Sequence, residues 1–356
     1  MNAPTLIFVG GFLGAGKTTL ILRAAALLRE KGTRVAVITN DQDRFLVDSR
    51  LAEAHNVATR EVAGGCFCCR FSDLISAADA LAAYAPEVIF AEPVGSCVDL
   101  SATILQPLKA SFRDRYRLAP LTVLIDPEMA ARVYSDLADT DVSFLYRHQV
   151  AEADLICASK ADRCPTFCPL PMPIDFQVSA LTGLGVGDWL AEVMDSSRIV
   201  GSHVLDVDYQ RYAAAEAALG WLNLQADVNL AEPLSPAMLV GPLLEDLDRR
   251  LTESGVQIAH LKIFDQAASG YVKASVCANG DEPWPMGDLA ASPERRHELV
   301  VNLRAIGEPE LLLALVRQAS GAISGSVRER HASCFRPAPP QPEHHPSKKT
   351  ESFSRT

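Results

Sequence analysis

The sequence predicts an α/β fold with a mostly parallel sheet, followed by a smaller α+β domain with an antiparallel sheet. Up to about residue 200, short apolar segments alternate with stretches of helical periodicity, which is typical of βαβ units. Beyond that point, apolar segments follow one another without helices between them, as neighbouring antiparallel strands do. The first apolar segment also runs into a glycine-rich loop and a helix, an order that favours phosphate binding at a helix N-terminus.

The first domain is expected to span residues 1–200. Its strands are runs of β-branched and aliphatic residues. The expected strands cover residues 5–9, 34–39, 59–62, 88–91, 121–125, 154–158 and 176–179, and the expected helices include one after residue 18 and others over 71–84 and 186–194. Polar residues follow these strands directly, and in a parallel sheet the functional site lies at the carboxyl ends of the strands.

The second domain is expected to span residues 201–328. Its expected strands cover 204–212, 222–230, 260–264, 271–278 and 299–306, with amphipathic helices over 236–254 and 308–319. From residue 329 the chain becomes rich in proline, serine and lysine, a composition that does not pack a core. Residues 329–356 are therefore expected to form a disordered tail that contains prolines and histidines.

Composition argues against several classes of protein. With 356 residues, 48% of them hydrophobic, the chain is long enough to bury two cores. Its formal net charge of −11 argues against nucleic-acid binding, which depends on clustered lysine and arginine. The apolar start lacks the basic residues and cleavage site of a signal peptide, and no segment is long and apolar enough for a membrane helix. We therefore expect a cytoplasmic protein with no nucleic-acid or membrane partner.

Residues 10–20 carry the clearest motif, because Gly11, Gly16, Lys17 and Thr18 fit the phosphate-loop pattern G-x-x-x-x-G-K-[ST]. The glycines let successive N–H groups point at phosphate oxygens, Lys17 reaches the β and γ phosphates, and Thr18 offers a hydroxyl to Mg²⁺. The motif predicts a P-loop NTPase domain of three layers. The residues expected to contact the nucleotide here are Gly11, Gly14, Ala15, Gly16, Lys17, Thr18 and Thr19.

Two carboxylates at strand ends complete the expected catalytic set. Glu92 is placed to hold Mg²⁺ through water or to orient an attacking water, and the N–H of Gly95 to sense the γ-phosphate. Asp41 follows the strand over 34–39 and is expected to share this role. The predicted catalytic residues are Lys17, Asp41 and Glu92, and the predicted Mg²⁺ ligands are Thr18, Asp41 and Glu92.

Two later segments predict a guanine site. Ser159-Lys160-Ala161-Asp162 matches the [NT]-K-x-D element except at its first position. In that element the aspartate accepts two hydrogen bonds from the guanine ring edge, which adenine does not donate, and the lysine stem covers the base. Ser179 and Ala180 fit the later loop whose backbone N–H meets the guanine oxygen. Lys160, Asp162, Ser179 and Ala180 are therefore expected to bind the base.

Cys66, Cys68 and Cys69 form the second strong signal, because three thiolates this close suit Zn²⁺, Cu(I) or an iron centre. The N-terminus of the adjoining helix is expected to lower their pKa values. Adjacent side chains converge poorly, so we expect two or three of these cysteines to bind a metal with a further ligand from elsewhere. Cys164 and Cys168 are the nearest source. A redox thiol switch and inert buried cysteines are the alternatives.

The chain resembles the CobW/HypB/UreG metallochaperone GTPases, most closely the CobW-like branch. The resemblance is carried by the phosphate loop, the Gly65-Cys-Phe-Cys-Cys69 segment and the E-x-x-G and K-x-D elements. The resemblance covers about residues 5–200. It implies a protein that hydrolyses GTP with Mg²⁺, carries Zn²⁺, Co²⁺ or a similar metal on the thiolates and delivers it to a client metalloprotein. It also implies control of transfer by the nucleotide state, and relatives in the HypB and UreG branches dimerise around nucleotide or metal.

The chain departs from the family pattern at several positions. Residues 40–43 read N-D-Q-D where N-E-x-G is usual, Ser159 replaces an asparagine, and residues 92–95 read E-P-V-G in place of E-T-T-G. The serine removes an amide that braces the guanine loop, which weakens the expected preference for guanine. Four residues near the C-terminus are similar to the metal-holding tails of some members: His331, Cys334, His344 and His345.

Two other functions fit the same phosphate loop. A P-loop small-molecule kinase would transfer phosphate to a metabolite and would not need Lys160 and Asp162. A metal-independent regulatory GTPase would act through a protein partner and leave the thiols inert. The combined motifs favour a GTPase that couples hydrolysis to metal delivery.

Overall fold

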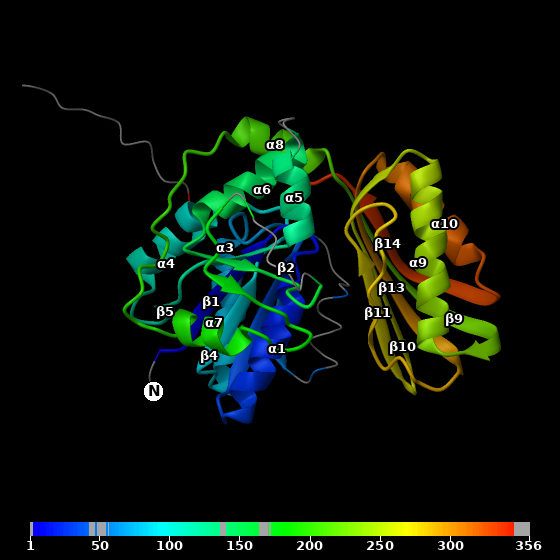
Figure 1. Cartoon of the computed structure of the whole chain (residues 1–356), viewed down its shortest axis with the longest axis horizontal. Coiled ribbons are helices and arrows are strands. Elements are labelled where there is room, and N and C mark those ends of the chain that lie inside the picture. The colour runs from blue at the N-terminus through cyan, green and yellow to red at the C-terminus, as the bar shows by residue number, and fades with distance from the viewer. Residues whose placement is uncertain are drawn as a thin grey trace, which may run out of the picture.

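The computed structural model describes residues 3–42, 47, 55, 57–135, 140–163, 170 and 172–344. Its strands form two sheets, which lie in two domains side by side (Figure 1). The first sheet is parallel, with strand order β3-β2-β4-β1-β6-β7-β8 and β5 paired to β1. The second is antiparallel, with order β12-β11-β10-β13-β9-β14. The predicted fold class is thus confirmed.

The first sheet places its carboxyl strand ends along one edge. Its strands are β1 Thr5–Gly11, β2 Val35–Asp41, β3 Ala58–Ala63, β4 Val88–Glu92, β5 Arg117–Leu118, β6 Thr122–Ile125, β7 Leu155–Ala158 and β8 Phe176–Gln177. β1 lies in the middle, between β4 and β6, and all seven of its residues are buried. A strand covered on both faces reads as a continuous apolar run, which is why it was visible in the sequence.

Helices cover both faces of the first sheet. They are α1 Lys17–Glu30, α3 Phe71–Leu81, α4 Gln106–Ser111, α5 Pro127–Ser135, α6 Asp141–Glu152, α7 Val186–Val193 and α8 Tyr209–Ala217. Ile7 of β1 lies in one core cluster with residues of α1 and α7. Phe8 lies in the other, with residues of α3 and α6. The domain therefore has three layers.

The second sheet is covered by helices on one face. Its strands are β9 Gly220–Leu234, β10 Gln257–Ala267, β11 Gly270–Val276, β12 Met286–Gly287, β13 Glu294–Ile306 and β14 Gly325–Phe335, and its helices are α9 Pro236–Glu253 and α10 Pro309–Gly321. Leu224, Leu261 and Val301 pack with α9 and α10 in a separate core cluster. Within the described residues, no helix combines the length and apolarity needed to span a bilayer.

Two expectations about this part of the chain are wrong. The predicted strand over 204–212 is absent, and Asp208 instead caps α8 by accepting hydrogen bonds from the N–H groups of Gln210 and Arg211. The predicted disordered tail does not begin at residue 329, because residues 329–335 belong to β14 and pair with β9. The tail composition begins only after the strand has ended.

Candidate functional site

The phosphate-loop residues adopt the backbone that their sequence requires. Gly11, Gly14 and Gly16 have φ angles of 132°, 77° and 92°, a region that residues with a Cβ rarely enter. α1 begins at Lys17, directly after Gly16. The Lys17 ammonium donates a hydrogen bond to the Gly11 carbonyl at 2.9 Å. The loop thus presents a helix N-terminus and a buried lysine at the carboxyl end of β1.

A cavity of about 590 Å³ adjoins this loop, within the size range of small-molecule sites. Most residues predicted to bind the nucleotide, to bind Mg²⁺ or to act in catalysis line it. They are Gly14, Ala15, Gly16, Lys17, Thr18, Thr19, Asp41, Glu92, Gly95, Lys160, Asp162 and Ala180. Gly11 and Ser179 lie behind the lining, where Gly11 accepts a hydrogen bond from Lys17 and Ser179 donates one to Asp162.

Two lining residues, Thr18 and Glu92, form an oxygen-rich group. The Thr18 hydroxyl donates to the Glu92 carboxylate at 2.9 Å, and both residues are buried. Hydroxyl and carboxylate oxygens are ligands that Mg²⁺ prefers, so these residues fit such an ion. A Cβ on Gly95 would lie 2.7 Å from Leu13 and 3.1 Å from the Lys17 ammonium. A side chain at this position would therefore press on Leu13 and Lys17 of the phosphate loop.

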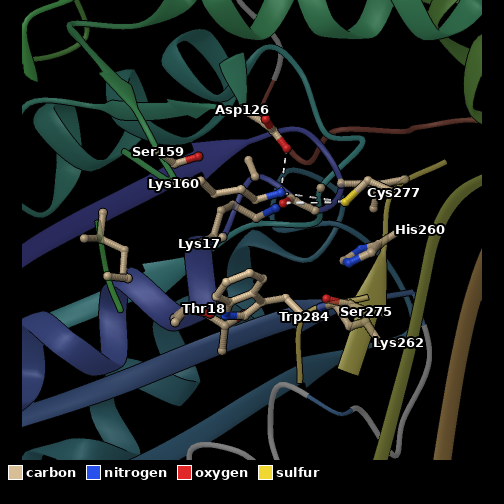
Figure 2. Close-up of a pocket in the computed structure, with 18 of the residues that line it drawn as sticks. Lys17, Thr18, Asp126, Ser159, Lys160, His260, Lys262, Ser275, Cys277 and Trp284 are labelled. Atoms are coloured by element: carbon tan, nitrogen blue, oxygen red, sulfur yellow. Dashed lines mark hydrogen bonds and ion pairs between the residues drawn. The ribbon is translucent and has the colours of Figure 1, made fainter. Parts of the chain in front are cut away.

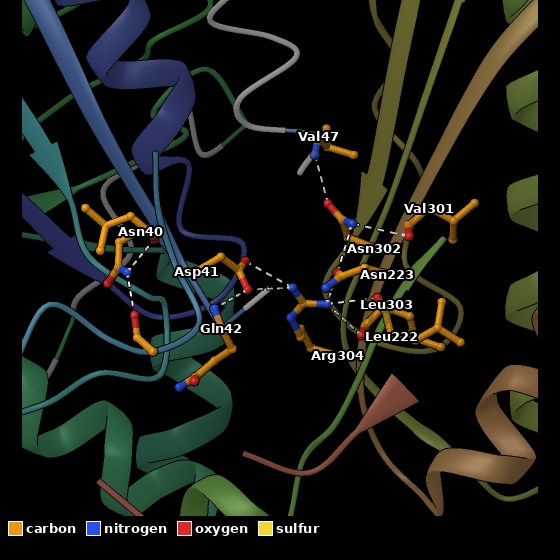
Figure 3. A network of polar contacts seen from close by, with 12 residues as sticks. Asn40, Asp41, Gln42, Val47, Leu222, Asn223, Val301, Asn302, Leu303 and Arg304 are labelled. Carbon is orange, nitrogen blue, oxygen red and sulfur yellow. Dashed lines mark hydrogen bonds and ion pairs between the residues drawn. The ribbon is translucent and has the colours of Figure 1, made fainter. Parts of the chain in front are cut away.

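Asp41 is held by the second domain. Its carboxylate oxygens lie 3.1 and 3.0 Å from one guanidinium nitrogen of Arg304, on β13 (Figure 3). The same guanidinium stacks over Trp221 at 4.1 Å from the ring centroid. Nearby, the Val47 N–H donates to Asn302 at 2.9 Å. Asp41, at the end of β2, and Val47, further along the chain, are therefore both hydrogen-bonded to the second sheet. The sequence did not indicate this connection.

The two predicted guanine-reading segments meet through a hydrogen bond, and residues of both line the cavity. Lys160 has a left-handed backbone, with φ of 55°, and its ammonium lies 2.5 Å from Asp126 (Figure 2). The Asp162 carboxylate accepts a hydrogen bond of 2.5 Å from Ser179. Ser159 is buried and donates to the Ile125 carbonyl at 3.1 Å, which braces the loop in place of the missing asparagine.

The second domain supplies a wall of the same cavity. The residues of this wall include His260, Lys262, Ser275, Cys277 and Trp284 (Figure 2). The Cys277 thiol lies 3.8 Å from the Gly14 carbonyl, and a Cβ on Gly14 would overlap its sulfur. The cavity is thus built by both domains.

Three buried thiols form a separate cluster. Ligand atoms of Cys66, Cys68 and Cys97 all lie within 4.8 Å of one another, a spacing that allows one metal ion to bind them together. The sulfurs of Cys66 and Cys68 are 2.7 Å apart, and that of Cys69 lies 3.3 Å from Cys66. Cys97 was not predicted. The available signal was its place two residues after Gly95, in the loop that carries Glu92.

The expected lowering of the pKa values of the three predicted cysteines is wrong. Hydrogen bonding with Cys66 and Cys69 raises the pKa of Cys68, and hydrogen bonding with Cys66 raises the pKa of Cys69 to about 11. The thiols of Cys66 and Cys68 instead donate to Cys97 and lower its pKa to about 7. Cys97, which was not predicted, is therefore the member of the cluster that loses its proton most readily.

Neighbouring side chains hold the loop that carries Cys97. The Gln149 amide donates to the carbonyls of both Gly95 and Cys97, each at 2.9 Å. Ser96 donates to Glu216 of α8 at 2.6 Å, and burial raises the pKa of Glu216 to about 7. The loop is therefore bonded on both sides, by α6 and by α8.

The chain end crosses the cysteine segment. The Gln341 N–H donates to the Cys69 sulfur at 3.1 Å, and the Glu343 N–H donates to the Cys68 carbonyl at 2.9 Å. The Glu343 carboxylate accepts from the N–H and hydroxyl of Ser72, in the first turn of α3. The Glu343 carboxylate offsets the partial positive charge at the N-terminus of α3, which was expected to lower the pKa values of the thiols.

Among the residues that the structure describes, the other suggested metal ligands do not join the cluster. The residue alternation of β14 places His331 and Cys334 on opposite faces of the second sheet. The His344 ring packs on Phe71, with centroids 4.6 Å apart. Three of the suggested ligands lie outside the described residues: Cys164, Cys168 and His345.

Comparisons with known proteins match the first part of the chain. A family model described as the CobW/HypB/UreG nucleotide-binding domain matches residues 5–168. Urease accessory protein UreG of Ureaplasma parvum is 42% identical over 71 residues, which are 18% of this chain and 34% of UreG. Zinc chaperone YjiA of Escherichia coli is 36% identical over 73 residues, 20% of this chain and 22% of YjiA. The matches therefore span about a third or less of these curated relatives.

Solved structures match more of the chain, but at lower sequence identity. Zn(II)-bound YjiA GTPase from E. coli has 16% sequence identity and a TM-score of 0.35, covering 91% of this chain and 99% of that one. HypB from Helicobacter pylori in complex with nickel has 18% identity and a TM-score of 0.39, covering 58% and 92%. The resemblance to the CobW/HypB/UreG family is thus confirmed for the nucleotide-binding domain, because the family model matches residues 5–168, which carry the phosphate loop.

Proposed function

We propose that this protein is a GTPase that binds a thiophilic transition metal and delivers it to a client metalloprotein. One observation carries the proposal: a single loop after β4 contributes to both sites. Glu92 and Gly95 face the nucleotide cavity, and Cys97 lies in the thiol cluster. A change in the position of Gly95 that depends on the γ-phosphate would displace a metal ligand two residues away.

Residues of the phosphate loop are proposed to bind the nucleotide, with Thr18 and Glu92 as the Mg²⁺ ligands. Bound there, Mg²⁺ neutralises developing charge on the phosphates. Asp41 remains a proposed Mg²⁺ and catalytic residue, and its ion pair with Arg304 would have to open first. Asp162 is proposed to read guanine, since Asp162 and Ala180 both line the cavity.

The metal cargo is proposed to bind Cys66, Cys68 and Cys97, with Cys69 at the margin of the cluster. Three buried sulfurs favour a soft metal such as Zn²⁺ or Co²⁺ over Mg²⁺. Delivery then requires the cluster to bind metal more weakly in one nucleotide state than in the other. The client, and any dimer that forms with nucleotide or metal, belong to the proposal as well.

The test is GTP hydrolysis by the reduced protein with and without one equivalent of Zn²⁺ or Co²⁺. We expect metal to change the rate in the wild type and in Cys334→Ser, a control whose half-buried thiol lies in β14. We expect no change with Cys66→Ser/Cys68→Ser/Cys97→Ser. A metal response that persists in the triple variant would contradict the metal site, and phosphate transfer to a metabolite would favour a kinase.

The number of sulfur ligands on the metal can be measured independently of GTP hydrolysis. Co²⁺ bound to thiolates absorbs strongly in the near ultraviolet, and we expect this band to weaken with Cys97→Ser as much as with Cys66→Ser. If Cys97→Ser left the band intact while Cys69→Ser removed it, the metal would be bound by the C-x-C-C segment alone. Titrations with GDP and with a GTP analogue would then show whether the nucleotide alters the affinity.

A further inference from the structure

The antiparallel sheet has one polar face, and this face is turned toward the first domain. Strand pairing places Lys262 opposite Ser275 and Asn302, so the three side chains share a face. Phe264 and Lys273 are paired on the same face. Phe264 packs into the first domain's core cluster, whereas the alternate residues pack on α9 and α10.

This polar face is largely shielded from solvent. Lys273 is 8% exposed and Asn302 5% exposed, although polar residues on an ordinary outer sheet face would be open to water. Both residues line the cavity that the phosphate loop adjoins, together with Lys262. A lysine this buried is rare in proteins unless an anion or polar groups accompany it.

Positive groups converge on this part of the cavity from both domains. Burial lowers the pKa of His260 well below 6.5, and four lysine ammoniums lower it further. Those lysines are Lys17, Lys160, Lys262 and Lys273. The chain as a whole has a net charge of −11, yet four lysines lie near one imidazole. This local positive charge indicates a site for an anion with several charges.

We infer that Lys262 and Lys273 of the second domain bind the phosphate groups of the nucleotide that the phosphate loop holds. The nucleotide would then lie between the two domains and join them. This inference rests on the proposed function for the nucleotide, and adds to it the residues that recognise the polyphosphate. Each ammonium would supply a charge-assisted hydrogen bond in a largely enclosed site.

The experiment compares the binding of fluorescent GTP and GMP to the full chain and to single variants. Lys262→Gln and Lys273→Gln are expected to weaken GTP binding about tenfold each, as charged hydrogen bonds do, and to leave GMP binding nearly unchanged. Lys31→Gln is the matched control, because Lys31 is exposed at the end of α1 and outside the cavity. Thermal unfolding checks that each variant is folded.

Lys17→Gln distinguishes a failure of the inference about the second domain from a failure of the proposed nucleotide site. If it abolishes GTP binding while Lys262→Gln and Lys273→Gln bind as the wild type does, the inference about the second domain is wrong and the nucleotide site stands. If Lys17→Gln itself binds GTP normally, the proposed nucleotide site is wrong.

A further measurement needs no variant. Lysine acylation followed by mass spectrometry is expected to show that GTP with Mg²⁺ protects Lys262 and Lys273 and leaves Lys31 reactive. Equal labelling of Lys262 and Lys273 with and without nucleotide would overturn the inference.

Discussion

The two sheets of this protein carry their polar residues in different places. In the parallel sheet, polar side chains stand at the ends of apolar strands, as Glu92 does after β4. In the antiparallel sheet, polar side chains lie between apolar ones within a strand, as Lys262 lies between Leu261 and Ile263 in β10. The arrangement in the parallel sheet marks a site in the sequence, because a buried strand otherwise holds no charge. The alternation in the antiparallel sheet resembles an ordinary solvent-facing surface, although here it forms a cavity wall.

The largest expected effect comes from the ion pair between the sheets. Arg304→Gln would leave Asp41 partly buried without its cation, and removing one partner of a buried pair costs about 3–5 kcal/mol. Arg328→Gln is the control on the same sheet, since that side chain is 78% exposed and its pair with Asp227 should contribute little to stability. Urea unfolding of the full chain measures both. Similar losses for the two variants would mean that the polar face behaves as open surface.

Acid sensitivity is the next largest effect. The pKa of His260 is lowered on folding, so the unfolded chain binds more protons and stability falls as pH drops through 6.5. Between pH 7 and pH 5 this single group should remove about 2 kcal/mol. His260→Asn should lose correspondingly less stability over the same interval. If wild type and variant lost equal amounts, the imidazole would be more solvated than its buried position indicates.

Contact between the phosphate loop and the second sheet predicts a smaller change. Gly14→Ala adds a methyl group against the Cys277 sulfur, at a backbone φ of 77° that alanine disfavours. We expect GTP binding to weaken about tenfold, which corresponds to about 1.4 kcal/mol. Adding Cys277→Ala should restore part of this loss because it removes the overlap. A double variant no better than Gly14→Ala would show that the sheet does not press on the loop.

The smallest effect concerns the chain end. Ending the chain after Arg336 keeps β14 intact and removes the Gln341 and Glu343 contacts with the cysteine segment. Alkylation of Cys69 should become a few-fold faster, because the groups covering its sulfur are gone. Cys277, in the cavity, serves as the internal reference. Equal Cys69 rates in the two chains would mean that the tail does not protect the thiol.

The fold was largely predictable, and the errors have physical causes. Apolar runs identified the parallel strands because both sheet faces are buried. The expected strand over 204–212 failed because Asp208 is a helix cap, a local signal that outweighs weak apolar alternation. The tail boundary failed because β14 is an edge strand with many exposed residues and little apolar pattern.

By itself, the sequence determined the phosphate loop, since glycine conformations and the helix that follows are local properties of residues 10–20. It likewise brought Cys66, Cys68 and Cys69 together by adjacency. Only the tertiary structure decided that Cys97 joins the thiols and that Arg304 holds Asp41. Such groups lie far apart along the chain and meet only because the strands align their ends and the second sheet packs over them. No local pattern encodes that packing.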